Sequence, residues 1–260
     1  MRILIAGLGL IGTSLALDLS AQGHDVAGYD PNPEHRALAL QRGAVRSYAR
    51  PSEGSYDRIL LAAPPRASLE LLAMPWQAPL WLDTGSVKQP ICAEARQRRL
   101  PFVGGHPLAG NAGEGPAAAR AGLFRGRGFA LCPGGGPGDL AEEIVRSLGA
   151  RPIWRDAAEH DRQVAASSHL CYAFSCALAL TLEDLPRELI GPAAWEMLRV
   201  ATSPTGLWQE ILEMNGPAVA QARAALGDAL TAAAGGDGAM LEAARAAAAR
   251  LRQEARPDGG

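Results

Sequence analysis

Lysine is nearly absent from this chain of 260 residues: Lys88 is the single lysine among 25 cationic side chains. Chemistry that requires a lysine amine is therefore confined to one position. The formal charge of -2 at pH 7 argues against a nucleic-acid binder, because such proteins carry a basic patch. The four cysteines form no Cys-x-x-Cys pair and no zinc-site spacing. We expect reduced thiols, no metal site and a cytoplasmic protein.

Long apolar runs are also missing. The N-terminal segment MRILIAGLGLIG is apolar, but its glycines are typical of a strand, a turn and a helix rather than of a signal peptide. No apolar run reaches the roughly 20 residues of a membrane span, so we expect no association with membranes. At 260 residues, the chain is long enough for one large or two small domains with a buried core.

Strand and helix patterns alternate over residues 1–155. The predicted strands are residues 2–6, 25–29, 58–63, 80–83, 102–103, 129–132 and 152–154. The helical spacing of apolar residues is clearest at residues 11–22, 33–42 and 67–73. This alternation predicts an α/β fold with a mainly parallel, Rossmann-type sheet.

The pattern changes after residue 155. Residues 157–183 contain neither Gly nor Pro and are predicted to form one long helix. Further helices are predicted at residues 192–200, 207–214, 217–234 and 239–254. We therefore expect an all-helical second domain over residues 156–255, followed by a disordered tail at residues 256–260.

A glycine motif joins the first predicted strand to the first predicted helix. The segment Gly7-Leu8-Gly9-Leu10-Ile11-Gly12 matches GxGxxG, and Asp30 ends the next strand. The first glycine permits a tight turn, the second lets the backbone approach a pyrophosphate, and the third allows close helix packing. The alternative is a glycine-rich turn without a ligand, but the strand, helix and acid together predict a dinucleotide site. Asp30 favours NAD over NADP, although nearby Arg36 offers a charge for a phosphate.

Two segments near strand ends combine small residues with a reactive side chain. They are Asp83-Thr84-Gly85-Ser86-Val87-Lys88 and Gly104-Gly105-His106-Pro107-Leu108-Ala109-Gly110. We interpret both as loops at the carboxyl edge of the sheet, where ligands of such folds bind. His106 is the candidate base for a hydroxyl that is being oxidised, and Ser86 is its candidate partner. The alternative for His106 is a loop histidine that caps a strand end.

These motifs, in this order and spacing, resemble the prephenate/arogenate dehydrogenases of tyrosine biosynthesis. The resemblance continues in the helical half, with Ser167-Ser168-His169-Leu170, then Arg199-Val-Ala-Thr-Ser-Pro204, Trp208 and Asn215. It covers roughly residues 2–216. The segments DTGSVK and GGHPLAG are specific to the family, whereas the glycine motif alone is not.

The resemblance implies an NAD-dependent oxidative decarboxylation of a cyclohexadienyl carboxylate, either prephenate or arogenate or both. Hydride leaves ring C4 for the nicotinamide, His106 takes the hydroxyl proton, and loss of CO2 makes the ring aromatic. Ser86 is expected to bind the same hydroxyl or the nicotinamide. The residues expected at the substrate are Arg199, Ser168, His169, Tyr172 and Trp208. A homodimer through the helical domain is also expected.

The chain departs from the family on the long helix. Many relatives carry Pro and a second His at the positions of Cys171 and Tyr172. The Tyr172 hydroxyl either replaces that histidine or belongs to a core aromatic, so the choice between prephenate and arogenate stays open. Trp208 is likewise either a core residue or a cavity wall. The apolar neighbours of Arg199 indicate a half-buried helix and therefore a paired arginine.

Rival functions were weighed against particular residues. The β-hydroxyacid dehydrogenases use a lysine on the helix entering the second domain, but residues 89–260 contain none. Hydroxyacyl-CoA dehydrogenases pair their histidine with a glutamate in a different context. A non-catalytic NAD-binding sensor would need the fold and Asp30, but not Ser86, His106 and Arg199 together.

Lys88 is expected to orient the Ser86 loop or to place positive charge beside the cofactor or the substrate carboxylate. We therefore include it among the cofactor contacts. The full predicted set is Gly7, Leu8, Gly9, Leu10, Ile11, Gly12, Asp30, Ala63, Pro64, Thr84, Gly85 and Lys88.

Overall fold

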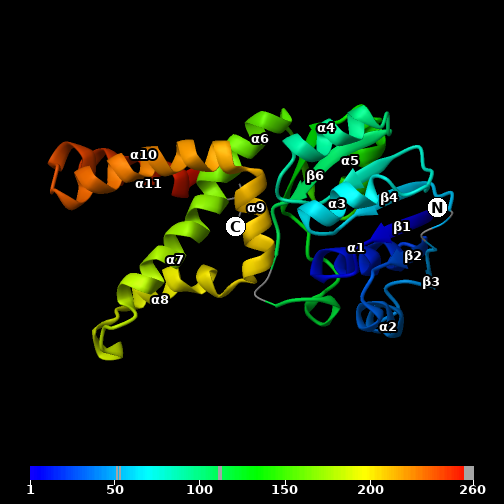
Figure 1. Ribbon diagram of the computed structural model, residues 1–260, viewed down its shortest axis with the longest axis horizontal. Coiled ribbons are helices and arrows are strands. Elements are labelled where there is room, and N and C mark those ends of the chain that lie inside the picture. Colours follow the sequence, from blue (N-terminus) through cyan, green and yellow to red (C-terminus); the bar gives the residue numbers. More distant parts are fainter. Residues whose placement is uncertain (51, 53, 111–112, 255–260) are drawn as a thin grey trace.

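The protein consists of a sheet domain and a helical domain that lie side by side (Figure 1). A computed structural model describes residues 1–50, 52, 54–110 and 113–254. In these residues one sheet has the strand order β3-β2-β1-β4-β5-β6-β7-β8. Every neighbouring pair is parallel except β6 and β7. The expected Rossmann-type α/β fold is confirmed, while the domain end at residue 255 and the tail at 256–260 lie outside the described residues.

The central strands β1, β4 and β5 are buried on both faces, whereas the edge strand β3 is exposed. The strands are β1 (Arg2–Ala6), β2 (Asp25–Tyr29), β3 (Ser47–Tyr48), β4 (Arg58–Leu61), β5 (Trp81–Asp83), β6 (Phe102–Pro107), β7 (Gly128–Pro133) and β8 (Arg151–Trp154). In β1, Ile3 and Ile5 belong to one core cluster, and Leu4 and Ala6 belong to another. This alternation is what a parallel sheet covered on both sides requires.

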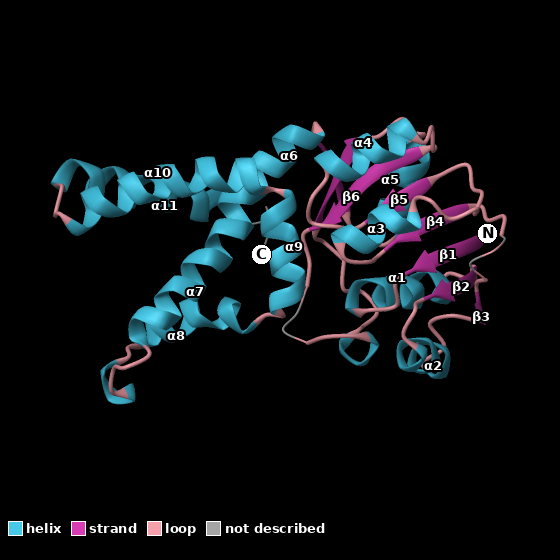
Figure 2. Ribbon diagram, viewed as in Figure 1, coloured by secondary structure: helices cyan, strands magenta, loops and turns pink. Residues whose placement is uncertain are grey.

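Helices cover the sheet from both sides (Figure 2). They are α1 (Leu10–Ala21), α2 (Pro33–Gln41), α3 (Pro65–Leu71), α4 (Gln89–Gln97) and α5 (Gly138–Ser147), with the 3-10 turn η1 (Pro116–Ala118). Side chains of α1, α2 and α5 join the core cluster of Ile3, and those of α3 and α4 join the cluster of Leu4. The site is therefore built on a rigid, fully covered sheet.

Strand β6 corrects one expectation. The segment containing His106 was expected to be a loop, but β6 continues to Pro107. It pairs antiparallel with β7, so that His106 lies opposite Ala130. The partner strand supplies the hydrogen bonds that keep the chain extended, and this pairing has no signal in the local sequence. His106 therefore stands on a strand rather than on a flexible loop.

The helical domain begins at Ala157, just after β8. Its elements are α6 (Ala157–Val164), η2 (Ala165–His169), α7 (Leu170–Leu182), η3 (Arg187–Leu189), α8 (Pro192–Leu198), η4 (Arg199–Thr202), α9 (Thr205–Met214), α10 (Gly216–Ala234) and α11 (Gly238–Glu254). The first three form one continuous helix, as expected from the missing Gly and Pro. The middle turn, η2, is π-helical, and π turns inside α-helices frequently occur at functional sites.

This continuous helix is more apolar than the sequence inspection suggested. Ala157–Leu182 is a 26-residue helix with a mean hydropathy of 1.4 over its most apolar window. By length and composition alone it is able to cross a membrane, which corrects the expectation that no segment is long enough. One such helix is weak evidence for a membrane span, since core helices of soluble proteins meet the same criterion. Only 28% of that window is buried in the single chain.

Helices α6 and α9 connect the two domains. Ala157 of α6 belongs to the core cluster beneath α4, and Met214 of α9 packs against the same cluster. At the other end of the contact, the Arg66 backbone N–H donates to Glu210 at 3.0 Å, and the Arg66 guanidinium pairs with Glu213. These contacts hold α9 beside the sheet domain (Figure 1).

Candidate active site

The three glycines of the first turn have three different surroundings. Gly7 has a φ of +100°, and a Cβ there would lie 2.3 Å from the Ala62 carbonyl oxygen. A Cβ on Gly12 would lie 1.8 Å from the Gly7 oxygen. A Cβ on Gly9 would meet no described atom within 4 Å. Gly7 and Gly12 are therefore required by the fold, whereas Gly9 keeps open the surface that a ligand approaches.

Asp30 lies at the end of β2, directly across from this turn. Its side chain accepts hydrogen bonds from the backbone N–H groups of Leu8 and Asn32, both at 2.8 Å. Carboxylate oxygens have further lone pairs, so the side chain keeps capacity to accept from ribose hydroxyls. The Arg36 guanidinium donates to the Asp30 backbone oxygen at 2.6 Å and to Pro31 at 3.1 Å. It therefore stabilises the turn after β2.

A cavity of about 510 Å³ runs along the glycine turn and Asp30. Of the predicted cofactor residues, it is lined by Gly7, Gly9, Asp30, Ala63 and Pro64. Several other lining residues had no signal in the sequence: Pro31, Asn32, His35, Glu70 and Met74. They carry no motif of their own and reach the cavity only through the arrangement of β2, α2 and α3. The shape and polarity suit the adenosine half of a dinucleotide.

A second cavity of about 500 Å³ lies where the domains meet. The sheet domain contributes the predicted residues Gly9, Leu10, Ile11, Ala63, Pro64, Thr84, Gly85 and Ser86. The helical domain contributes Ser203, Pro204, Leu207, Trp208 and Ile211. Ala109 and Gly110, which follow the strand of His106, also line it. The structure thus places the Ser86 loop and the predicted wall residue Trp208 around one space.

Leu8 and Gly12 belong to the predicted cofactor set but do not line either cavity. The Leu8 side chain is fully buried and packs beneath the turn, close to Gly28. Only its backbone N–H takes part in the site, through Asp30. These two positions shape the turn instead of touching what binds there.

The structure of Lys88 agrees with the expected role of orienting the Ser86 loop, but it contradicts the expected contact with the cofactor. The Lys88 side chain is fully buried, and it forms an ion pair with the buried Asp83 carboxylate. The ammonium also donates to the Gly105 carbonyl oxygen at 2.6 Å, while the Gly105 N–H donates to Asp83 at 2.7 Å. Lys88 has no exposed surface with which to contact a cofactor, so it supports the backbone from below. The pair fixes both ends of the Ser86 loop and the residue next to His106.

His106 is the first member of a buried hydrogen-bonded chain. Its Nδ1 lies 2.9 Å from His160 Nε2, and His160 Nδ1 lies 2.8 Å from Asp161 Oδ1. Burial, followed by the neighbouring charges of His160, Lys88 and His169, holds the pKa of His106 well below its ordinary value. A neutral imidazole at neutral pH is the state that a general base needs.

His169 and Trp208 form a second cluster on the helical side. Asn215 Nδ2 lies 3.1 Å from His169 Nδ1, and the same amide donates to the Asp161 backbone oxygen at 2.8 Å. The opposite nitrogen, His169 Nε2, is buried without a hydrogen-bond partner in the described part of the chain. Burial lowers the pKa of His169 to about 4. Because Nδ1 accepts from the amide, Nε2 carries the hydrogen and remains available as a donor.

Tyr172 supports Trp208 rather than facing solvent. The two rings stack in parallel with centroids 4.2 Å apart, and the edge of His169 meets the indole at 6.2 Å. Burial raises the pKa of the Tyr172 hydroxyl, and a hydrogen bond with Cys176 raises it further. The hydroxyl is thus engaged inside the helical domain. Trp208 is both a packed residue and a cavity wall.

The remaining predicted substrate residues lie on the helical side. Ser168 is half-buried in the π turn η2. Arg199 begins the 3-10 turn η4, close in sequence to the lining residues Ser203 and Pro204. The expectation that Arg199 is half-buried is wrong, because this residue is exposed, while its pairing with a substrate carboxylate stays a prediction. The apolar neighbours that suggested burial include Met197, which is itself 51% exposed.

No role was predicted for His160 and Asp161 from the sequence, and Asn215 stood there only as part of the family resemblance. The partners of these residues lie far away in the chain. His106 is 54 residues from His160, and Asn215 is 54 residues from Asp161. A buried histidine beside an acid on a helix that enters a second domain was the only available signal.

Known proteins match this architecture. Residues 15–153 match the family model described as "Prephenate dehydrogenase, nucleotide-binding domain". Prephenate dehydrogenase of Lactococcus lactis is 30% identical over 234 residues, which cover 82% of this chain and 65% of the relative. The chain thus spans about two thirds of that relative's length. Cyclohexadienyl dehydrogenase of Zymomonas mobilis is 32% identical over 243 residues, which cover 84% of this chain and 82% of the relative.

The fold is also that of a solved structure. Prephenate dehydrogenase from A. aeolicus, in complex with hydroxyphenyl propionate and NAD+, superposes with a TM-score of 0.86. It is 22% identical, and the match covers 97% of this chain and 98% of that one. Similarity at this level shows a shared fold, including the helical domain. With the matching nucleotide-binding domain and the Zymomonas relative, the chain belongs to the prephenate dehydrogenase family.

Proposed function

We propose that this protein catalyses the NAD-dependent oxidative decarboxylation of prephenate, of arogenate or of both, in tyrosine biosynthesis. The observation that carries the proposal is the cavity at the domain junction. It brings the glycine turn, the Ser86 loop and Trp208 around one space, beside the strand of the neutral base His106. The names of the matched relatives, prephenate and cyclohexadienyl dehydrogenase, support the same chemistry.

The residues around the glycine turn fit a dinucleotide. Gly9 leaves room for a pyrophosphate, and the N-terminus of α1, which begins at Leu10, directs its amide groups toward that space. The two cavities meet at Gly9, Ala62, Ala63 and Pro64, so adenosine and nicotinamide would extend in opposite directions from the pyrophosphate. When bound, NAD supplies the acceptor for the hydride.

NAD is favoured over NADP by the chain that follows β2. The Asp30 carboxylate is 7% exposed and stands where the ribose hydroxyls of the adenosine half would lie. A 2′-phosphate at that position would meet a like charge. Arg36, the candidate phosphate ligand, is already hydrogen-bonded to the backbone oxygens of Asp30 and Pro31. The arginine therefore reinforces the acidic turn.

Each side chain has a defined task in the proposed reaction. His106 removes the proton from the C4 hydroxyl, and Ser86 donates a hydrogen bond to a group at the same end of the cavity. Arg199 pairs with a substrate carboxylate, for which its planar guanidinium is suited. His169 is fully buried and lines neither cavity, so it supports the Trp208 indole from behind. Trp208 forms an apolar wall that excludes water from the ring.

Aromatisation drives the second half of the reaction. Once C4 is a carbonyl, electrons from the breaking bond between C1 and its carboxylate flow into the ring and onto the C4 oxygen. The enzyme needs only to hold the ring in place while CO2 leaves. The substituent that distinguishes prephenate from arogenate is not decided by Tyr172, because its hydroxyl is engaged with Cys176.

The proposal is tested by mixing protein, NAD and either prephenate or arogenate, and by following NADH absorbance. Turnover of at least one acid is expected, and comparison of kcat/KM for both acids with NAD and NADP defines the specificity. His106→Asn should lower kcat by about 10²-fold or more while NAD binding stays nearly unchanged. Absence of turnover with both acids, from protein that binds NAD, would exclude the dehydrogenase function.

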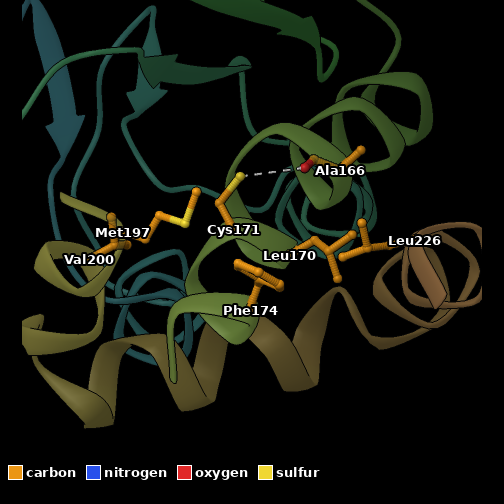
Figure 3. Close-up of a pocket in the computed structure, with 7 residues that line it drawn as sticks. All are labelled: Ala166, Leu170, Cys171, Phe174, Met197, Val200 and Leu226. Atoms are coloured by element: carbon orange, nitrogen blue, oxygen red, sulfur yellow. Dashed lines mark hydrogen bonds between the residues drawn. The ribbon is translucent and has the colours of Figure 1, made fainter. Parts of the chain in front are cut away.

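A homodimer through the helical domain is the second part of the proposal. An apolar pocket of about 340 Å³ opens between α7, α8 and α10, lined by Ala166, Leu170, Cys171, Phe174, Met197, Val200 and Leu226 (Figure 3). Elsewhere in the helical domain, Leu180 and Leu189 are each 74% exposed. Exposed apolar surface of this extent marks an interface, and a second copy of the chain offers the same surface in return. Light scattering should give the mass of a dimer.

We also propose that the enzyme works in the cytoplasm, without membrane or nucleic-acid partners. Cys92, Cys132, Cys171 and Cys176 are all free thiols, as reducing conditions require. The apolar helix Ala157–Leu182 carries His160, Asp161 and His169 into the site. Fractionation of cells that express the protein should place it in the soluble fraction.

A further inference from the structure

The series of hydrogen bonds from His106 through His160 ends at the Asp161 carboxylate, which accepts from three N–H groups. Asp161 Oδ1 lies 2.7 Å from the Lys88 backbone nitrogen and 2.8 Å from His160 Nδ1. Asp161 Oδ2 lies 2.8 Å from the Gln89 backbone nitrogen. These backbone groups stand at the N-terminus of α4, where the helix dipole favours negative charge. Asp161 is therefore an ionised acceptor, and His160 carries its hydrogen on Nδ1.

This arrangement fixes the tautomer of both histidines. A neutral His160 with hydrogen on Nδ1 has a bare Nε2, which accepts from His106 Nδ1–H at 2.9 Å. The other nitrogen of His106, Nε2, then has no hydrogen. It is the only ring nitrogen of His106 left to receive a proton. His160 and Asp161 are 2% and 3% exposed, so water does not compete for these bonds.

In the proposed reaction, the proton removed from the C4 hydroxyl must return to the C4 oxygen. Oxidation breaks the C4 O–H bond and forms a carbonyl, and decarboxylation then returns an electron pair to the same oxygen. That oxygen becomes a phenol only when a proton is restored to it. The reaction as a whole releases no proton, so the enzyme must hold one between the two steps.

We propose that His160 and Asp161 position His106 as a base and share the stored proton with it, an inference that rests on the proposed function. When substrate O–H breaks, a new N–H bond forms at His106 Nε2. The hydrogen on His106 Nδ1 moves to His160 Nε2, and the resulting imidazolium lies beside the Asp161 carboxylate. Aromatisation reverses both transfers and returns the proton to the C4 oxygen.

Other titratable groups lie close to the hydrogen-bonded residues His106, His160 and Asp161. Lys88, with its partner Asp83, lies beside His106 from the β5 side, and His169 faces it from η2. Protonation of His160 before substrate binds would reverse the first hydrogen bond, so that His160 Nε2–H donates to His106 Nδ1. His106 would then carry its hydrogen on Nε2 and could not act as a base.

The tautomer is measurable without substrate. In protein labelled with 15N-histidine, the spectrum of neutral His106 should show hydrogen on Nδ1. In His160→Phe, which fills the same space without an acceptor, His106 should move its hydrogen to Nε2. Wild-type protein with hydrogen on Nε2 of His106 would overturn the proposal. Because this readout needs only the folded protein, it does not depend on whether the proposed substrates are correct.

Kinetics test the shared proton. With the acid that the wild-type enzyme oxidises, His160→Phe should lower kcat about 10²-fold and leave KM within about twofold. His160→Gln should recover part of this loss, because its carbonyl oxygen accepts from Nδ1–H but takes up no proton. His24→Gln, a histidine far from both cavities, is the matched control and should keep wild-type kcat.

The outcomes separate the two proposals. Wild-type protein that oxidises neither acid contradicts the proposed function and leaves the tautomer result to decide the arrangement of the histidines. Wild-type turnover combined with an unchanged kcat in His160→Phe overturns the shared proton. If His160→Phe does not fold, the wild-type spectrum and the kinetics of His160→Gln decide the question. In that case a wild-type kcat in His160→Gln counts against proton sharing.

Discussion

The sheet domain and the helical domain differ in how completely they bury their apolar side chains. Strands β1, β4 and β5 are buried on both faces, and α1 and α5 add their leucines, isoleucines and valines to the same core. In the helical domain, α8 and α10 contain no buried residue in the described structure. Leucines at 180, 185, 189, 230, 241 and 251 are exposed there.

The exception lies at the domain junction. Tyr172, Ile211, His169 and Asn215 are buried, and they surround the cavity or the hydrogen-bonded chain behind it. The helical domain is therefore well packed where it forms the site and open where a second copy would cover it. The sheet domain buries its apolar side chains by itself, whereas the helical domain buries them mainly where it meets the sheet domain.

The largest effect is expected in the sheet domain, at its buried ion pair. Lys88→Met leaves the Asp83 carboxylate buried without its cation, which should lower the free energy of unfolding by about 3–5 kcal/mol. Urea denaturation measures the loss. The exposed pair of Arg98 and Glu94 is the control, since Arg98→Met should cost at most about 1 kcal/mol.

A double variant sharpens this result. Asp83→Asn combined with Lys88→Met removes both charges and should be more stable than Lys88→Met alone. Equal stability of Lys88→Met and wild type would show that the pair does not stabilise the sheet domain.

The second-largest effect is expected at the domain junction, where acid should lower the free energy of unfolding through His169. The pKa of His169 is about 4 in the folded protein, against an ordinary value of 6.5. Between these pH values the unfolded chain binds a proton on His169 that the folded protein does not bind. As the pH falls from 6.5 to about 4, the free energy of unfolding should drop by up to about 3 kcal/mol from this residue. His169→Gln should show a shallower fall over that window in urea titrations. Parallel curves for the two proteins would contradict the assignment.

A smaller effect is expected where the helical domain meets the substrate. Arg199→Ala should raise KM for the acid substrate by about 10- to 100-fold, with kcat changed much less, because a charged hydrogen bond is lost in binding. Steady-state kinetics measure both constants. Arg46→Ala, an exposed arginine of the sheet domain, should behave as wild type. An unchanged KM in Arg199→Ala would place the carboxylate elsewhere.

The smallest effect on the stability of the single chain is expected at its open surface. Leu180→Asp places a charge on a side chain that is 74% exposed, so the fold of one chain should hold while the dimer dissociates. Light scattering should report a monomer. Leu40→Asp, on an exposed leucine of α2, is the matched control and should leave the dimer intact. A dimeric Leu180→Asp would locate the interface outside this surface.

Local features of the site were predictable from the sequence. The glycine turn and Asp30 follow from residues close together in the chain, where strand, turn and helix signals overlap. The long helix at the start of the helical domain followed from the missing Gly and Pro over residues 157–183. By contrast, His106 lies in a strand because β7, some 25 residues later, pairs with it. Such pairing has no local signature.

Contacts between residues far apart in the chain were the least predictable. The bonds from His106 to His160, and from Asn215 to both Asp161 and His169, join residues about 50 positions apart. The exposure of Arg199 was misjudged for the same reason, since apolar neighbours indicate burial only when another element covers them. The burial of Lys88 likewise depends on β5 and β6 lying side by side.

The π-helical turn η2 between α6 and α7 determines how the side chains of α7 are rotated about the helix axis relative to those of α6. A π turn holds one more residue than an α-helical turn, and each residue turns the helix by about 100°. Deleting Ala166 would convert η2 into an ordinary α-helical turn and rotate α7 by that angle. His160 and Asp161 would keep their place against the sheet domain, but Tyr172 would turn away from Trp208. The one additional residue in η2 thus sets the orientation of Tyr172 relative to His160 and Asp161 on the same continuous helix.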